Sequence, residues 1–454
     1  MNKEIGNKDS FIALGSDNIG KLLMKYAIPA IIAMTASSIY HITDSIFIGH
    51  GVGELAISGL AITFPLMNLA AAFGSLVGTG GATLLSVRLG QKDYETANKI
   101  LGNVILLNFM IGIGFSVLAL IFLDPLLYFF GASNNTLPYA RDFMYIILIG
   151  NVFTHLYLGL NAMLRSIGSP QKAMLATIFT VIINLILNPL FIFGLKWGIR
   201  GSALATVISQ VIVLTWQIRL FSGNKSFIKI QKNIFHFDWK IVRDSFAIGM
   251  SPFLMNFASS IIAVLINRGL TKYGGDLAVG AYGIINRIAF LFVMIVLGLN
   301  QGMQPIAGYN YGAKQFSRVN EVLKKTIFLA TCVMTVGFAI VELFPEFIAS
   351  LFTRSSEQIG LTATGLRIVF MFYPIVGFQM VVSTFFQSIG MASKAIFLSL
   401  TRQVIFLIPC LIILPRFYGT TGIWMSMPIS DFIATILTTI LLVLQYRQFK
   451  KQSV

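Results

Sequence analysis

The chain has 454 residues, of which 56% are hydrophobic and 11% are charged, and its mean hydropathy is +0.81. This composition is too apolar for a soluble domain and predicts a protein embedded in a lipid bilayer. The formal net charge of +16 does not indicate a nucleic-acid partner, because the basic residues are distributed among loops along the chain.

Uncharged apolar segments of spanning length recur along the chain. Residues 102–123 and 173–195 each reach the ~20 residues that a helix needs to cross the hydrocarbon, whereas barrel strands need about half as many. We expect an all-α integral membrane protein with twelve transmembrane helices. They are predicted to begin near residues 22, 55, 96, 138, 171, 198, 241, 277, 318, 360, 394 and 420.

The polar first twenty residues lack the apolar core and cleavage site of a signal peptide. If the N-terminus is cytoplasmic, most of the 33 lysines and arginines fall in cytoplasmic segments, in agreement with the positive-inside rule. We therefore expect a multi-pass protein of the inner (cytoplasmic) membrane with both termini in the cytoplasm.

The first predicted span contains an acid at membrane depth, within SSIYHITDSIFIG at 37–49. On a helix, Ser37, Tyr40, His41 and Asp44 share one face. A polar stripe at this depth indicates a hydrated cavity, a partner or an ion path. Two alternatives stay open: Asp44 reaches the interface from the end of its helix, and His41 is a hydrogen-bonded structural residue.

The fifth predicted span contains a second polar cluster, NLILNPLFIFG at 184–194. Asn184 and Asn188 are four residues apart, and Pro189 removes a backbone hydrogen bond and frees carbonyl oxygens. Such oxygens, together with a carboxylate, suit Na⁺ and also suit a hydrogen-bond network around a titrating acid. This interpretation predicts a Na⁺ site at Asp44 and Asn184, with helix–helix packing by asparagine as the alternative.

Three further charged residues are candidates for membrane depth. Arg287 lies within a predicted span, and Glu342 is expected near the outer surface. Asp431 follows Pro428 in the last span and is interpreted as a structural hydrogen-bonding acid or as lining the second half of the protein.

The two halves of the chain resemble each other at an offset of 222 residues. GELA at 53–56 returns as GDLA at 275–278, and RSIGSPQKA at 165–173 returns as QSIGMASKA at 387–395. Several matches in one register predict a parallel internal repeat of two six-helix bundles. Asp44 has no counterpart, because the same offset leads to Ile266.

This repeat divides the chain into three predicted parts. They are an N-terminal six-helix lobe at 1–221, a basic cytoplasmic linker at 222–240 and a C-terminal six-helix lobe at 241–454.

Motifs of catalysis are missing from the sequence. The four histidines lack the spacing of a zinc helix motif, the two cysteines lie far apart in apolar segments, and neither a phosphate loop nor a G-x-S-x-G elbow occurs. We expect no enzymatic activity and no cofactor. Transport by such a chain would be passive or driven by an ion gradient.

Three stretches resemble the multidrug and toxic compound extrusion (MATE) family, specifically its MepA-type and DinF-type branch. They are TDSIFIGHGVGELAISGLA at 43–61, NLILNPLFIFGLKWGIRGSALAT at 184–206 and AYGIINRIAFLFVMIVLGLNQGMQPIAGYNYGAK at 281–314. The resemblance extends over nearly the whole chain. Residues 245–267 and 368–388 contain no acid, unlike the family branch that places further acids in spans 7 and 10.

The resemblance implies a cation-coupled antiporter that exports bulky, often cationic amphipathic drugs and toxins by alternating access. It assigns cation coupling, with Na⁺ or H⁺ as the ion, to Tyr40, Asp44, Asn184, Asn188 and Thr206. At Asn188 the family often has an aspartate, so a single carboxylate is expected here and the identity of the ion stays open.

A substrate cavity is expected between the lobes, and Met67, Asn68 and His41 are predicted to line it. The expected partners are small amphipathic molecules and membrane lipids, without nucleic acid, and the protein is expected to be a monomer. Two alternatives are a lipid-linked oligosaccharide flippase of the same superfamily and a non-transporting membrane assembly factor.

Overall fold

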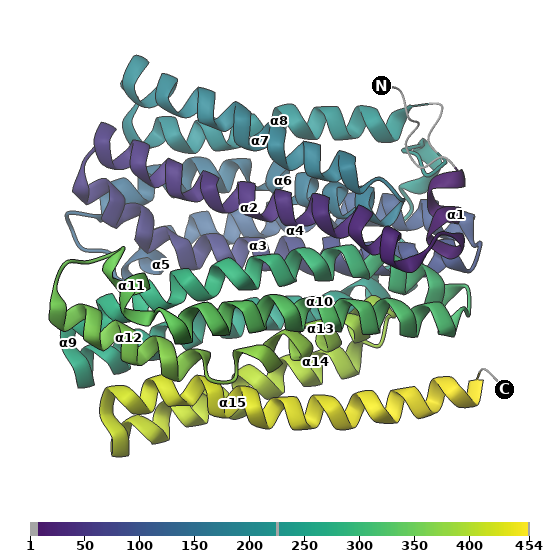
Figure 1. Ribbon diagram of the computed structural model, residues 1–454. Helices are drawn as coiled ribbons and strands as arrows, with labels where there is room; N and C mark the ends of the chain where they lie inside the picture. Colours follow the sequence, from purple (N-terminus) through teal and green to yellow (C-terminus); the bar gives the residue numbers. More distant parts are fainter. Residues whose placement is uncertain (1–7, 224–226, 453–454) are drawn as a thin grey trace.

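A computed structural model of the protein describes residues 8–223 and 227–452 (Figure 1). The side chains of a few residues within these ranges, including His41, lie outside the description. The described chain is helical throughout and contains no strand. Its elements are α1 (Lys8–Ser16), α2 (Ile19–Gly51), α3 (Glu54–Gly90), α4 (Tyr94–Ile121), α5 (Leu123–Phe129), α6 (Leu137–Ser166), α7 (Pro170–Pro189), η1 (Leu190–Gly194), α8 (Gly198–Ser222), η2 (Lys232–Ile234), α9 (Trp239–Gly312), α10 (Phe316–Leu343), α11 (Pro345–Ser350), α12 (Ser356–Phe370), α13 (Tyr373–Ser388), α14 (Ala392–Leu400), η3 (Thr401–Leu407) and α15 (Ile408–Gln452).

The described helices account for the predicted membrane crossings. Ten are long and apolar enough to cross a membrane, and α12 with α13, bent by 49° at a short break, makes an eleventh. One of the ten, Ala392–Gln448, has 57 residues, far more than the ~20 of one crossing. The backbone of Gly419 leaves the helical region there, with φ 56° and ψ −133°, and divides the segment in two. With this division the described chain makes the twelve predicted crossings.

Helix α9 also contains two crossings. It runs for 74 residues, and Gly275 interrupts it with φ 64° and ψ −165°. Only glycine adopts such a conformation without strain. We call Trp239–Gly275 the first half of α9 and Leu277–Gly312 its second half.

The helices form two bundles that lie side by side, and both chain termini lie at the same end of the molecule (Figure 1). One bundle contains α2 to α8 and the other contains α9 to α15. The backbone preserves the internal repeat, because left-handed residues recur 222 positions apart: Gly53 with Gly275, Lys92 with Lys314, and Gly168 with Gly390. The predicted fold class, two repeated six-helix lobes, is confirmed.

The hydrophobic cores show where the lobes join. One core combines C-terminal lobe residues with the half of the N-terminal lobe near the termini, such as Leu23 and Leu101. A second core belongs to the N-terminal lobe alone and lies at its other end, with residues such as Ile48 and Leu148. The lobes therefore share a core at the terminus-bearing end and pack separately at the opposite end.

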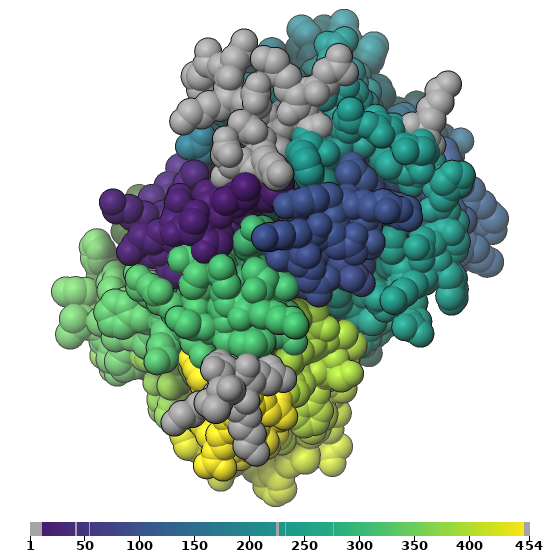
Figure 2. All heavy atoms as spheres, turned by 90° about the vertical axis from the view of Figure 1, so that its right-hand side faces the viewer, coloured from purple at the N-terminus to yellow at the C-terminus, as the bar shows by residue number. Residues whose placement is uncertain are grey.

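Glycines permit the closest contacts between the lobes. A Cβ atom on Gly80 of α3 would lie 1.9 Å from the carbonyl oxygen of Ser245, and one on Gly249 of α9 would lie 1.8 Å from that of Leu76. No side chain fits at these distances, so the crossing of α3 and α9 depends on both glycines. In Figure 2, which faces the terminus-bearing end, the purple N-terminal segment lies directly against the green segment of the C-terminal lobe.

The segment between the lobes packs against α4. Helix α8 ends at Ser222 and α9 begins at Trp239. Asn98 of α4 accepts a hydrogen bond from the backbone N–H of Lys229 at 3.1 Å, and Asn103 donates to the backbone oxygen of His236 at 3.0 Å. Residues 222–240, predicted as a linker, thus have a fixed path along the N-terminal lobe wherever the structure describes them.

Candidate functional site

Three helices of the N-terminal lobe bring together the five residues predicted to couple a cation. Tyr40 and Asp44 lie on α2, Asn184 and Asn188 on α7, and Thr206 on α8. Each pair is four residues apart, which places both side chains on one face of its helix. These faces meet inside the bundle, where Asp44, Asn184 and Asn188 are buried.

Asp44 is the acidic centre of this cluster. Its side chain is buried, with 6% exposed. One carboxylate oxygen, Oδ1, accepts hydrogen bonds from Nδ2 of Asn188 and, at 2.6 Å, from the hydroxyl of Ser202. Burial penalises an isolated charge, and donors aimed at the carboxylate reduce this penalty. Asp44 therefore lies in the interior of the bundle and not on its surface.

A second set of hydrogen bonds lies one helical turn away. The Tyr40 hydroxyl and Oγ1 of Thr206 are 2.8 Å apart, and Asn184 donates from Nδ2 to the same Oγ1 at 3.2 Å. Thr206 thus connects α2 with α7 through its contacts with Tyr40 and Asn184. Asp44 connects the same two helices through Asn188. The two sets lie one helical turn apart on the same three helices, and we refer to them together as the polar cluster.

The cluster retains unused acceptors. The amide oxygens of Asn184 and Asn188 are buried and lack a hydrogen-bond partner among the described residues. Such oxygens usually find a partner. Asn188, whose amide nitrogen donates to Asp44, therefore keeps an acceptor near the carboxylate, and Asn184 keeps one near Thr206. Hard monovalent cations prefer oxygen ligands, and the cluster offers carboxylate, amide and hydroxyl oxygens. The described residues contain no group of three or more His, Cys, Asp or Glu that would hold a transition metal.

The backbone beside the cluster is irregular. Pro189 has no N–H, so it cannot bond to the carbonyl four residues earlier. Directly after it the chain forms a π-helix, η1, over Leu190–Gly194. Such π-turns occur frequently at functional sites, and this one places Asn188 next to a locally widened helix.

Ser202 is the member of the cluster that the sequence interpretation missed. It is fully buried and donates to Asp44. It lies four residues before Thr206 in GIRGSALAT, the same spacing that singled out Asn184 and Asn188. The signal was present, but serine is common in membrane helices and its partner lies 158 residues away.

The residues predicted to line a substrate cavity occupy different environments. Met67 is half-buried and packs against the core of the N-terminal lobe, where its sulfur accepts a hydrogen bond from Thr63 at 3.7 Å. Asn68 is exposed on α3. The side chain of His41 lies outside the described part of the structure. Contact of these three residues with a substrate stays a prediction.

The C-terminal lobe contains an ion pair among its last helices. Asp431 of α15, with 7% exposed, accepts a hydrogen bond from Nε of Arg402 at 2.7 Å. Arg402 lies in the second π-helix, η3. Glu342 is exposed next to the last residue of α10. The buried acid of this lobe is therefore engaged by a guanidinium of its own lobe.

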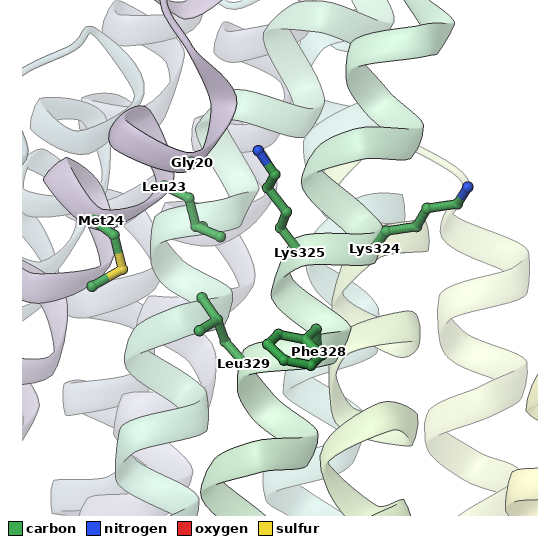
Figure 3. A pocket seen from close by; sticks show the side chains of 7 residues that line it. All are labelled: Gly20, Leu23, Met24, Lys324, Lys325, Phe328 and Leu329. Carbon is green, nitrogen blue, oxygen red and sulfur yellow. The ribbon is translucent and has the colours of Figure 1, made fainter.

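A separate hollow of about 390 Å³ lies at the terminus-bearing end between α2 and α10 (Figure 3). It is lined by Gly20, Leu23, Met24, Lys324, Lys325, Phe328 and Leu329. Gly20 precedes Asp44 by 24 residues of one helix, which corresponds to about 36 Å. The hollow is thus remote from the polar cluster.

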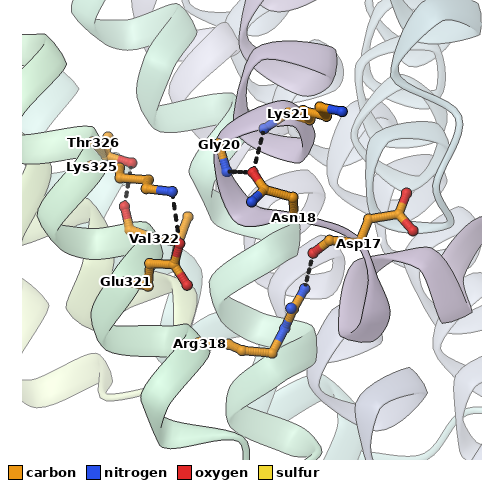
Figure 4. A network of polar contacts seen from close by, with 9 residues as sticks. All are labelled: Asp17, Asn18, Gly20, Lys21, Arg318, Glu321, Val322, Lys325 and Thr326. Atoms are coloured by element: carbon orange, nitrogen blue, oxygen red, sulfur yellow. Dashed lines mark hydrogen bonds and ion pairs between the residues drawn. The ribbon is translucent and has the colours of Figure 1, made fainter.

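Polar contacts lie next to this hollow at the start of α2 and along α10 (Figure 4). The Asn18 side chain accepts from the backbone N–H of Gly20 at 3.0 Å and begins α2. Arg318 of α10 donates to the backbone oxygen of Asp17 at 2.6 Å, and Lys325 pairs with Glu321 at 2.7 Å. The contact of Arg318 with Asp17 joins the lobes at the end where they share a core, and the other two contacts are local to α2 and α10.

Comparisons with known proteins agree with this architecture. The family model MatE matches residues 29–190 and 251–412, one match in each lobe. The chain is 28% identical over 420 residues to the "Multidrug export protein MepA" of Staphylococcus haemolyticus (strain JCSC1435), covering 92% of each chain. It is 26% identical over 416 residues to the protein of the same name from Staphylococcus aureus (strain MRSA252), again covering 92% of each.

Solved structures show the same fold. The MATE multidrug transporter DinF-BH, determined in complex with R6G, is 35% identical and superposes with a TM-score of 0.88, covering 94% of this chain and 96% of that one. An outward-facing multidrug resistance MATE family transporter, 24% identical, superposes with a TM-score of 0.91 and covers 97% of this chain and 98% of its own. With matches in both lobes and over nearly its full length, the chain belongs to the multidrug and toxic compound extrusion (MATE) family.

Proposed function

We propose that the protein is a cation-coupled antiporter that exports bulky, often cationic amphipathic compounds across the inner membrane, with both termini in the cytoplasm. The names of its relatives, multidrug export proteins, support the substrate class. The observation that supports the coupling is the buried Asp44 carboxylate, which accepts from the neutral donors Asn188 and Ser202 in a cluster that retains two unpaired amide oxygens.

In this proposal a cation neutralises Asp44 and changes the packing of α2 against α7 and α8. A proton would make the carboxylate neutral and weaken the need for the Asn188 and Ser202 donors. Na⁺ would instead recruit the amide oxygens of Asn184 and Asn188 beside the carboxylate. In either case the ion drives transport only if its affinity differs between the two packings.

The arrangement of the lobes supports alternating access. They share a core and close glycine contacts at the terminus-bearing end, and they pack separately at the other. With cytoplasmic termini, this corresponds to a protein closed on the inside and open on the outside. Transport then requires the contacts at the closed end to break.

The test is a transport assay with purified protein in liposomes. A fluorescent cationic amphiphile is followed under an imposed Na⁺ gradient or an imposed H⁺ gradient, for the wild type, Asp44→Asn and Glu346→Gln. Glu346 is an exposed acid on α11 and serves as the matched control. We expect transport by the wild type and the control, and a loss of at least about tenfold in Asp44→Asn, equivalent to ~1.4 kcal/mol.

The gradient that drives transport identifies the ion. Equal gradient-driven transport by the wild type and Asp44→Asn would contradict the proposal, because Asp44 would then be structural.

A further inference from the structure

One face of the second half of α9 packs against the N-terminal lobe. A Cβ atom on Gly298 would lie 2.5 Å from the Ile31 side chain, and one on Gly302 would lie 2.7 Å from Cα of Ala27. Both glycines are buried. Their spacing of four residues places them on the same face of the helix, so this face marks the contact between the lobes.

Arg287 lies on the same face, further from the termini. It precedes Gly298 by eleven residues, which is close to three full helical turns. Unlike the glycines, Arg287 is exposed. The face that is buried between the lobes at Gly298 is therefore open at Arg287. This places Arg287 in the space between the lobes at the end where they pack separately.

One face of the first half of α9 likewise changes along the helix from buried to exposed. Gly249 packs against Leu76, and Phe253 contacts Phe73 with ring centroids 4.9 Å apart. The same face continues with Asn256 and Asn267, which are exposed. Amide side chains on a lipid-facing surface would be costly, so a polar exposed face on a membrane helix indicates a hydrated space.

The exposed face of α9 between the lobes carries a positive charge at Arg287. The spans at 245–267 and 368–388 contain no Asp or Glu. Asp431 is engaged by Arg402, and no ion pair involving Arg287 occurs among the residues that the structure describes. A substrate facing the C-terminal lobe therefore meets amide groups and a guanidinium, whereas the carboxylate of Asp44 lies inside the opposite lobe.

We propose that Arg287 binds the carboxylate of amphipathic zwitterionic substrates and so determines how well these substrates are transported relative to simple cations. The inference rests on the proposed export function. A guanidinium offers two parallel N–H donors that match a carboxylate, and the charge-assisted pair is stronger than a neutral hydrogen bond. The aromatic body of such a substrate would contact the apolar neighbours of Arg287, of which Phe290 and Leu291 are exposed.

The experiment compares two dyes that differ only in the anionic group: a rhodamine with a free carboxylate and its ethyl ester. Transport into liposomes is measured for the wild type, Arg287→Gln, Arg287→Lys and Arg354→Gln. Arg354 is exposed in the loop between α11 and α12 and provides the control. We expect Arg287→Gln to lower the transport rate of the carboxylate dye at least tenfold and to leave that of the ester within twofold. Arg287→Lys should retain part of the preference, because lysine keeps the charge without the planar pair of donors.

The ester also reports on folding, because a misfolded variant would transport neither dye. Equal losses for both dyes in Arg287→Gln, or no loss for either, would overturn the assignment. If the wild type transports the ester but not the carboxylate dye, the proposed export function is supported and the proposed role of Arg287 is contradicted. If the wild type moves neither dye, the proposed function itself fails.

Discussion

At the scale of single residues, the candidate site depends on neutral groups that make a buried carboxylate tolerable. Asn188 and Ser202 lie 144 and 158 residues from Asp44 in sequence and donate to the same carboxylate oxygen. Removing one donor to a charged group typically costs about 1.5–3 kcal/mol. The N-terminal lobe thus holds an acid that is stabilised by neutral donors, whereas Asp431 is paired with the cation of Arg402.

Ser202→Ala tests this dependence. Loss of the hydroxyl removes a donor from Asp44 and should lower gradient-driven transport by about tenfold, which corresponds to ~1.4 kcal/mol. Ser209→Ala is the matched control. Ser209 is equally buried on the same helix, but its hydroxyl donates to the backbone oxygen of Thr206 and not to Asp44. Initial rates in liposomes are the measurement. Similar rates for Ser202→Ala and Ser209→Ala would show that the hydroxyl does not support Asp44.

At the scale of elements, α9 carries most of the contact between the lobes. Its first half crosses α3 at Gly80 and Gly249, and its second half crosses α2 at Gly298 and Gly302. Helices of a membrane protein gain little from burying apolar surface, so close backbone packing has a large share in holding them together. The crossing points should therefore tolerate additional atoms poorly.

Gly249→Ala examines the crossing of α3 and α9. The added methyl group would meet the Leu76 backbone at 1.8 Å, and overpacking of this kind typically costs about 1–3 kcal/mol. We expect a lower midpoint of thermal unfolding in detergent. Gly283→Ala is the control on the same helix, since nothing lies within 4 Å of the position that its Cβ atom would occupy. An unchanged midpoint for Gly249→Ala would mean that the crossing relaxes at no cost.

At the scale of the whole molecule, the proposed alternating access requires the terminus-bearing end to open. The lobes share a core there, and Gln304 of α9 donates to Thr83 of α3 at 2.7 Å. Asn310 adds a hydrogen bond to the backbone oxygen of Leu14 at 2.9 Å. Because these contacts belong to one arrangement of the lobes, a covalent bond across them should stop the transport cycle.

Cysteines at Thr83 and Gln304, in a variant with Cys332 and Cys410 replaced by serine, provide this bond. A short thiol-specific cross-linker should lower transport at least tenfold, and a reducible linker should restore the rate after reduction. Each single-cysteine variant treated with the same reagent is the control. Undiminished transport by the cross-linked protein would contradict a cycle that opens this end.

Much of this protein could be predicted from its sequence. Apolar segment lengths determine a helical membrane protein with twelve crossings, because a backbone in hydrocarbon must satisfy its own hydrogen bonds. The register of 222 residues determines two like lobes, and helical spacing singles out Asp44, Asn184 and Asn188 as polar groups at depth. These features follow from local periodicity and from the solvent, which act on every segment independently of its neighbours.

Tertiary structure alone decided which polar groups meet and which surfaces are open. Ser202 joins Asp44 only because α8 packs beside α2, and Arg287 is exposed only because the lobes pack separately beyond Gly298. Both outcomes depend on contacts between segments that are distant in the chain. The angle and the closeness of those contacts come from the packing of whole helices, which no local pattern encodes.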